Sequence, residues 1–177
     1  MTESYLAYRN LFQNLKLDVR PLMYMTTTLK EFMSRKLESI EITASLQEAA
    51  KMMTIKDISS LIITDKNNRD VGLVSERDIV RKGCSREDID INAVRVSEIM
   101  SSPIITINHK STPQEAAELL IKNKIRHLLV VDDAGKHVGI ITPMDFTRYK
   151  QLNYNTSYGD KAEAADTVTK ILEYYVD

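Results

Sequence analysis

The chain carries hydrophobic residues every three or four positions from Leu46 to Met53, a spacing that predicts an amphipathic helix. Ser45 precedes this stripe and Glu48 stands three residues later, which is the pattern of a capping box at a helix start. We therefore expect a helix from Ser45 to about residue 56. The uninterrupted apolar run 61–63 is typical of a strand that is buried on both faces.

Shorter patterns on either side complete a unit of strands and helices. Strands are expected at residues 39–42 and 70–74, where apolar residues lie between polar turn residues. Ser75 is expected to cap a helix over 76–82, and Gly83 is expected to end that helix. The order of elements in this unit is β-α-β-β-α.

The same unit occurs twice, 67 residues apart. The segment Val71–Asp78 matches Val138–Asp145, and fifteen of the 53 aligned positions between Leu29–Arg81 and Val96–Arg148 are identical. Chance alone gives only a few identities over such a length, so the chain contains an internal duplication. The second copy predicts strands at 104–107, 127–131 and 137–141 and helices at 112–123 and 143–150.

The duplication divides the chain into five segments. They are an N-terminal helical extension at 1–26, repeat 1 at 27–83, a linker at 84–95, repeat 2 at 96–150 and a C-terminal helical tail at 151–177. The linker carries three acidic residues, Glu87, Asp88 and Asp90, and is expected to be polar and exposed.

Both extensions carry apolar residues at helical spacing. The N-terminal stripe follows Thr2, the expected cap of a short helix, and consists of Tyr5, Tyr8, Phe12 and Leu15. The stripe in the tail consists of Ala165, Val168, Leu172 and Tyr175. Such stripes usually pack on the domain itself or on a second subunit. The alternatives are a partner-binding arm at the N-terminus and an effector-recognition helix at the C-terminus.

Composition narrows the class of protein. With 43% hydrophobic and 28% charged residues over 177 positions, the chain is typical of a soluble globular protein with a substantial core. A formal net charge of −1 argues against a general nucleic-acid or membrane-surface binder. The single cysteine, Cys84, cannot form an internal disulfide, which fits a reducing compartment. Because no apolar run reaches the roughly 18 residues that span a bilayer, and no secretion signal is visible, we expect a cytoplasmic protein.

Four features recur in both copies and carry a resemblance to a known family. They are a leading E-x-M turn, a helix containing Q-E-A-A, a short strand that ends in Asp, and the motif G-h-h-[S/T]-x-x-D, where h is apolar. Over about residues 27–150 they resemble tandem CBS (cystathionine-β-synthase) domains, which form a Bateman module. The resemblance implies an α/β (α+β) fold in which two β-α-β-β-α repeats pack about a pseudo-twofold axis and leave two clefts. Modules of this family commonly form homodimers, bind AMP, ADP, ATP or S-adenosylmethionine in the clefts, and alter a partner protein.

The resemblance also indicates which residues contact an adenosyl ligand. Asp78 and Asp145 resemble the carboxylates that accept hydrogen bonds from the ribose. Ser75 and Thr142, together with the free N–H groups at the two helix starts, resemble contacts to phosphate or ribose. The alternative explanation is local: a hydroxyl before a helix often only caps it, and an acid in the first turn often only interacts with the helix dipole.

The resemblance also implies phosphate contacts at the start of one strand in each repeat. In repeat 2 these residues are Arg126 and His127, and their counterparts in repeat 1, Ser59 and Ser60, are uncharged. Charge compensation for phosphate is therefore expected to differ between the two clefts. Further candidate cations are Arg77, Lys122 and Lys124.

Apolar slots for the base are expected in the segments Leu37–Ile40 and Ile104–Ile107 and in the last strand of each repeat. The expected contacts are Ile40, Leu73, Ile105 and Ile140. Gly72 and Gly139 are expected to permit close packing of the backbone rather than to touch a ligand.

Motifs for catalysis are missing from the sequence. No Cys, His, Asp or Glu group has metal-ligand spacing, and no nucleophile elbow, phosphate-binding P-loop or zinc-protease motif is present. We therefore expect a protein that is not an enzyme and has no metal site.

Three hypotheses for function follow. The first is a regulatory module that binds an adenine nucleotide, or a related adenosyl ligand, and signals to a partner protein. The second is a structural or interaction protein with unused clefts, whose terminal helices recruit partners. The third is direct nucleic-acid binding through the basic residues between Lys122 and Arg126.

Overall fold

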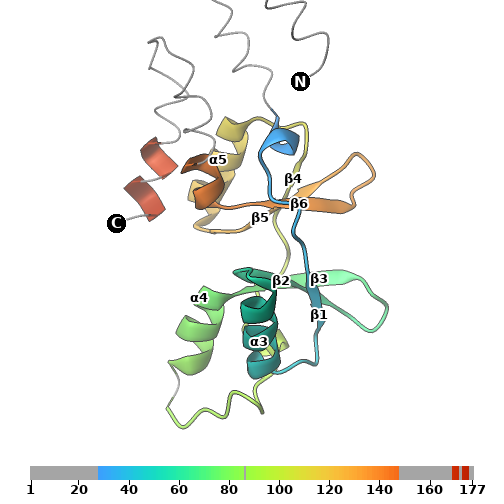
Figure 1. Ribbon diagram of the computed structural model, residues 1–177, viewed down its shortest axis with the longest axis vertical. Helices are drawn as coiled ribbons and strands as arrows, with labels where there is room; N and C mark the ends of the chain where they lie inside the picture. Colours follow the sequence, from blue (N-terminus) through green and yellow to red (C-terminus); the bar gives the residue numbers. More distant parts are fainter. Residues whose placement is uncertain (1–27, 86, 148–168, 172, 176–177) are drawn as a thin grey trace, which may run out of the picture.

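The computed structural model describes residues 28–85, 87–147, 169–171 and 173–175. The predicted N-terminal helix and its cap, Thr2, lie outside these residues. Within the described part of the chain, no helix has both the length and the hydrophobicity that crossing a bilayer requires. The described residues form two sheets that face each other, one from each repeat, with the helices on their outer sides (Figure 1).

Repeat 1 contains the predicted order of elements. They are β1 (Ser39–Glu41), α3 (Leu46–Lys56), β2 (Ser60–Thr64), β3 (Asp70–Ser75) and α4 (Glu76–Asp78), which continues as a π-helical segment, η2 (Ile79–Cys84). The central strand, β2, is parallel to β1 and antiparallel to β3. Its apolar residues 61–63 are at most 6% exposed, which confirms the prediction of a strand buried on both faces.

The capping box that the sequence predicts for α3 is present. The N–H of Ser45 donates to Glu48 Oε2 at 2.7 Å, and the N–H of Glu48 donates to Ser45 Oγ at 3.2 Å. The predicted end of the following helix is wrong, because Gly83 lies buried inside η2 rather than after it. A β-carbon at Gly83 would lie 2.7 Å from Leu46 Cδ1, so close packing against α3 explains the glycine.

Repeat 2 has the same topology. Its elements are β4 (Thr106–Asn108), α5 (Pro113–Asn123), β5 (Leu128–Val131) and β6 (His137–Ile141), followed by a helix whose described residues are 143–147. The predicted strand at 104–107 is corrected, because β4 begins at Thr106, the counterpart of Ser39, where pairing with the central strand starts in both repeats. His127 precedes β5 rather than opening it.

The turn that begins each repeat packs on the other repeat. Leu29 and Phe32, in and just after η1 (Leu29–Glu31), belong to the core of repeat 2. Val96 and Ile99, in and just after η3 (Val96–Glu98), belong to the core of repeat 1. Each hydrophobic core therefore contains residues from both halves of the duplication.

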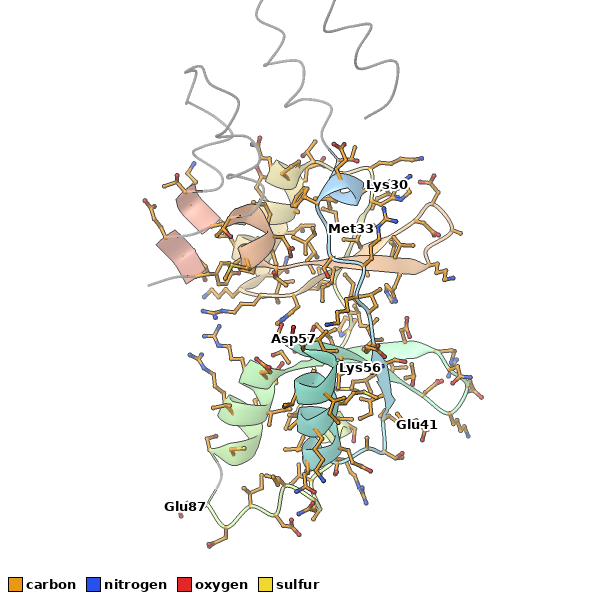
Figure 2. The ribbon with its side chains drawn as sticks, viewed as in Figure 1. Lys30, Met33, Glu41, Lys56, Asp57 and Glu87 are labelled. Carbon is orange, nitrogen blue, oxygen red and sulfur yellow. The ribbon has the colours of Figure 1, made fainter. Side chains whose placement is uncertain are left out.

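Backbone hydrogen bonds also join the segment after each leading turn to the sheet of the other repeat. Ser34 pairs with Ile140 in β6 through two hydrogen bonds of 3.0 and 2.8 Å, and Ser101 pairs with Leu73 in β3 in the same way. The segment after each leading turn thus lies along the last strand of the other repeat, where Figure 2 shows Met33 next to the sheet of repeat 2.

Two glycines make this close approach possible. A β-carbon at Gly139 would lie 2.5 Å from the Sδ atom of Met33, and one at Gly72 would lie 2.5 Å from the Sδ atom of Met100. A separation this short is incompatible with ordinary van der Waals contact. The prediction that these glycines permit close backbone packing is confirmed.

The linker is less exposed than its composition suggests. Ile89, Ile91 and Val94 are partly buried and pack against the core of repeat 1. The prediction of a polar, exposed linker holds for Glu87 and Asp90 but not for these three residues, because their apolar side chains pack against that core.

Apolar contacts also join the two sheets and dock the tail. Ile62, Leu129 and Ile140 form a buried cluster between the sheets. In the tail, Ile171 and Tyr175 are 0% and 9% exposed and belong to the core of repeat 2. The described part of the tail is therefore a helix docked on its own chain, beside α5 in Figure 1, while Ala165, Val168 and Leu172 of the predicted stripe lie outside the described residues.

Candidate functional site

Two cavities open at the boundary between the repeats. We call the one beside Ser75 and Asp78 the Asp78 cleft, and the one beside Thr142 and Asp145 the Asp145 cleft. Their volumes are about 590 and about 610 Å³. Both are within the range of small-molecule sites.

The two cavities bring together nearly all of the predicted ligand contacts. The Asp78 cleft is lined by Leu73, Ser75, Asp78, Ile105, Arg126 and His127. The Asp145 cleft is lined by Ser59, Ser60, His127, Ile140, Thr142 and Asp145. Every residue in each set was expected to contact a ligand, and residues distant in the sequence meet in each cleft.

Ile40 is the exception and lines neither cavity. It pairs with Ile63 in the sheet of repeat 1, and its side chain packs against the core that contains Ile63. Because neighbouring side chains of a strand point to opposite faces, only alternate residues of β1 can reach the boundary between the sheets. The expectation of a base contact at Ile40 is corrected for this reason.

Ser75 and Asp78 hold each other at the start of α4. The Ser75 N–H and hydroxyl donate to Asp78 Oδ2 at 3.0 and 2.6 Å, and the Lys82 ammonium lies 2.7 Å from Asp78 Oδ1. Burial raises the pKa of the Asp78 carboxyl, but the hydrogen bonds from Lys82 and Ser75 outweigh burial and hold this pKa below its usual value. Asp78 is therefore an ionised acceptor at neutral pH.

Thr142 and Asp145 repeat this arrangement in the other cleft. The Thr142 N–H and hydroxyl each donate to Asp145 Oδ2 at 2.8 Å, and the Asp145 side chain is buried. In both clefts the hydroxyl and the acid thus have the local capping role, and both residues also face the cavity. The two explanations considered for these residues are compatible.

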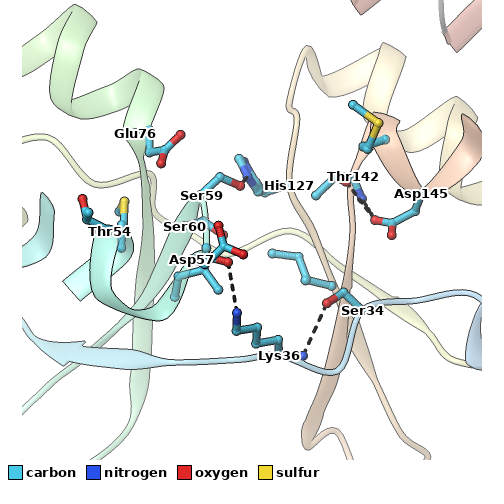
Figure 3. A pocket seen from close by; sticks show the side chains of 14 residues that line it. Ser34, Lys36, Thr54, Asp57, Ser59, Ser60, Glu76, His127, Thr142 and Asp145 are labelled. Atoms are coloured by element: carbon cyan, nitrogen blue, oxygen red, sulfur yellow. Dashed lines mark hydrogen bonds between the residues drawn. The ribbon is translucent and has the colours of Figure 1, made fainter. Parts of the chain in front are cut away.

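His127 lines both cavities at once. Its Nε2 atom lies 3.0 Å from Ser59 Oγ, a contact across the repeat boundary that is visible in Figure 3. Burial lowers the pKa of His127 to about 4, although Asp78 and Asp145 each act to raise it. His127 is therefore a neutral hydrogen-bonding group at neutral pH, positioned where the two clefts meet.

The Asp78 cleft is basic. Its cations among the described residues are Arg77, Arg81, Lys82, Lys124 and Arg126. Arg126, Arg77 and Lys124 were candidates from the sequence, whereas Lys122 lines neither cavity. Arg81 and Lys82 were missed, although their positions three and four residues after Asp78 put them on the same helix face.

The Asp145 cleft is acidic. Asp57 and Glu76 of repeat 1 line it together with Asp145, and Lys36 is the single cation among its described residues. Figure 3 shows Asp57 and Glu76 on the repeat 1 side of the cavity and Asp145 on the repeat 2 side. Asp57 was not predicted from the sequence, although it aligns with Lys124, a candidate cation, in the other copy.

The tail contributes two aromatic residues to the rim of the Asp78 cleft. Tyr174 is 46% exposed, and its ring lies edge-on to that of Tyr175, with centroids 4.8 Å apart. Both line the cavity. Within the described residues, no group of three or more His, Cys, Asp or Glu side chains is arranged to hold a metal ion.

Comparisons with known proteins agree with this architecture. The chain matches the CBS domain family over residues 29–84 and 96–151. A 17.7 kDa protein of Acidianus ambivalens is 30% identical over 139 residues, which are 78% of this chain and 82% of that protein. The inosine-5′-monophosphate dehydrogenase of Nitrosopumilus maritimus is 32% identical over 120 residues, which are 68% of this chain but 22% of the enzyme.

Two solved structures of similar chains contain adenosyl ligands. The CBS domain protein PAE2072 from Pyrobaculum aerophilum, complexed with AMP, matches with a TM-score of 0.62 and 30% identity, covering 74% of this chain and 100% of that chain. The CBS domain pair of protein MJ0100, in complex with 5′-methylthioadenosine and S-adenosyl-L-methionine, matches with a TM-score of 0.60 and 28% identity, covering 70% of this chain and 99% of that chain.

Proposed function

Because this chain belongs to the CBS domain family, we propose that it is a regulatory module that binds adenosyl ligands in its two clefts and signals their presence to a partner protein. The observation that carries the proposal is the repeated pair of a hydroxyl and an ionisable carboxyl at the rim of each cavity. A ribose presents two neighbouring hydroxyl donors, and a carboxylate with two oxygens is suited to accept both.

The regulatory part of the proposal follows from where the clefts lie. Each cavity is lined by residues of both repeats, so a bound ligand touches both. Such a ligand stabilises the relative arrangement of the repeats that it fits best, and it shifts the population toward that arrangement in proportion to its difference in affinity. A partner that recognises one arrangement, or a homodimer assembled from it, can then respond to the ligand.

Titration calorimetry tests this function. Nucleotide-stripped protein is titrated with AMP, ADP, ATP and S-adenosylmethionine, and the measurement is repeated on the double variant Asp78→Ala and Asp145→Ala. We expect at least one of the four ligands to bind the native protein and none to bind the double variant. Unchanged affinity in the double variant overturns the assignment of these carboxylates.

A matched control separates binding from helix capping. Glu48 and Glu115 make the same capping contacts in α3 and α5 but line neither cavity. The double variant Glu48→Ala and Glu115→Ala loses comparable capping energy, about 1 kcal/mol at each site, and we expect it to bind as the native protein does. If no ligand binds to folded, empty protein, the structural and interaction hypothesis replaces this one.

A further inference from the structure

The two clefts occupy equivalent places in the fold but carry opposite charge. The described lining of the Asp78 cleft has five cations and one carboxylate, whereas that of the Asp145 cleft has one cation and three carboxylates. His127, which both clefts share, is neutral near pH 7 and does not reduce the difference. A ligand therefore meets a positive potential in one cleft and a negative potential in the other.

Asp57 and Lys124 show that the difference lies in the side chains and not in the backbone. They end the equivalent helices α3 and α5, and both adopt the left-handed conformation, with φ and ψ of 52° and 57° at Asp57 and 54° and 36° at Lys124. The fold thus projects a side chain from the same place into each cleft. The sequence puts an acid there in one repeat and a base in the other.

Other equivalent positions change the charge in the same direction. Arg126 in the Asp78 cleft corresponds to Ser59 in the Asp145 cleft, and Arg77 corresponds to Met144. Each replacement removes a cation that a phosphate group can use, and arginine is the side chain best suited to bidentate phosphate binding.

We propose that the two clefts bind different classes of adenosyl ligand, a nucleotide polyphosphate in the Asp78 cleft and a cationic adenosyl sulfonium with an amino-acid group in the Asp145 cleft. This inference rests on the proposed function and adds a ligand class to each site. Polyphosphate carries three or four negative charges that the basic cleft compensates and the acidic cleft repels.

The charges of the Asp145 cleft match those of the sulfonium ligand one by one. Such a ligand carries two cationic groups, the sulfonium and the ammonium, and one carboxylate. When Asp145 is engaged with the ribose, two carboxylates remain for the cations, Asp57 and Glu76, and Lys36 remains for the ligand carboxylate. The Lys36 ammonium lies 3.1 Å from the carbonyl oxygen of Asp57, which keeps the lysine at this wall of the cavity.

The test compares ATP and S-adenosylmethionine by titration calorimetry, each alone and each after saturation with the other. We expect one ATP and one S-adenosylmethionine per chain, with neither displacing the other. In the double variant Asp57→Asn and Glu76→Gln we expect S-adenosylmethionine to bind roughly tenfold more weakly and ATP to bind as before. Asparagine tolerates the left-handed conformation of residue 57, so this variant retains the fold.

Two further variants provide the matched controls. The double variant Glu41→Gln and Glu87→Gln removes two exposed acids outside both cavities, both labelled in Figure 2, and it is expected to bind both ligands normally. The double variant Lys124→Ala and Arg126→Ala is expected to weaken ATP binding at least tenfold and to leave S-adenosylmethionine binding unchanged.

Four outcomes overturn the assignment, and they differ in whether the proposed function survives. Competition between ATP and S-adenosylmethionine for a single cleft, or two ATP molecules per chain, leaves the proposed function intact but contradicts the separation by charge. Native binding of S-adenosylmethionine to the Asp57→Asn and Glu76→Gln variant also contradicts it. If neither ligand binds folded protein, the proposed function fails as well.

Discussion

The guanidinium of Arg126 is held against Tyr175 at the rim of the Asp78 cleft. Arg126 Nη2 donates a hydrogen bond of 3.0 Å to the Tyr175 carbonyl oxygen, and Arg126 Cζ lies 5.5 Å from the centre of the Tyr175 ring. The Tyr175 hydroxyl lies 2.7 and 2.5 Å from the carbonyl oxygens of Leu120 and Ile125. The tail is thereby anchored to the end of α5, and it positions a cation that the proposed nucleotide site uses.

Removal of the Tyr175 side chain, which lines the Asp78 cleft and packs against Arg126, is expected to weaken nucleotide binding. In Tyr175→Ala the tail loses its anchor and Arg126 loses the ring beneath it, so we expect ATP affinity to fall several-fold. The buried ring also contributes to folding, and its loss is expected to lower the free energy of unfolding by about 3–5 kcal/mol. Titration calorimetry and chemical denaturation measure the two effects.

The variant Tyr175→Phe is the control for this prediction. It keeps the ring and the backbone carbonyl that contact Arg126 but loses the hydroxyl contacts to α5. We expect a loss of about 1 kcal/mol in stability and native affinity for ATP. Native ATP affinity in folded Tyr175→Ala protein would contradict the positioning role.

His127 is expected to make stability depend on pH between about 6.5 and about 4. Burial lowers its pKa from 6.5 to about 4, so in this interval the unfolded chain takes up a proton that the folded protein does not. The contribution of His127 to stability is therefore complete above pH 6.5 and is lost as the pH falls toward 4. Denaturation curves at pH 7 and pH 5 measure this decrease.

The variant His127→Gln removes the titrating group and is the reference for that measurement. Carboxyls with lowered pKa, such as Asp78 and Glu48, also cost stability on acidification, but they do so mainly below pH 4.5 and are present in both proteins. We expect the native protein to lose more stability than the variant when the pH is lowered from 7 to 5. An equal decrease in both proteins would show that His127 is not buried in its neutral form.

Gly139 and Met33 are expected to show a strong energetic coupling. In Gly139→Ala the new β-carbon would lie 2.5 Å from Met33 Sδ, and overpacking of this kind costs about 1–3 kcal/mol. Adding Met33→Ala removes the clashing atom, so the double variant is expected to be more stable than the two separate losses predict. Met100→Ala, which relieves the equivalent contact at Gly72, is the control and is expected to give no coupling with Gly139→Ala.

Because the leading turn of each repeat packs on the other repeat, a substitution next to that turn is expected to destabilise the other repeat. Ile99 follows the turn that begins repeat 2 but packs in the core of repeat 1, so Ile99→Ala is expected to cost about 2–4 kcal/mol and to reduce amide protection first in α3 and β2. Phe32→Ala is the mirror experiment and is expected to act first on α5 and β5. Native-state hydrogen exchange reads out each region. Loss of protection confined to α5 in Ile99→Ala would contradict the exchanged packing.

Local patterns account for what could be predicted before the structure. The helices α3 and α5, their caps and the buried central strands follow from residue spacing and from hydrogen bonds between residues three or four positions apart. Most residues of the candidate site could also be predicted, because the same pair of a hydroxyl and an acid occurs in both copies of the repeat. Where the sequence was misread, at Gly83 and at Ile40, the deciding contact was with a residue distant in the chain.

The sequence by itself therefore determined the repeated unit, the family, the residues that cap the helices and the carboxylates proposed to accept hydrogen bonds from a ribose, because each depends on chemistry within a few neighbouring positions. Only the tertiary structure decided which turn packs on which core, that His127 belongs to both clefts, and that Asp57 and Glu76 share a cavity with Asp145. The physical reason is that a cleft draws its charge from residues that meet only when the two repeats are packed together. The spacing of residues within one strand or helix does not indicate which residues of the other repeat line the same cleft.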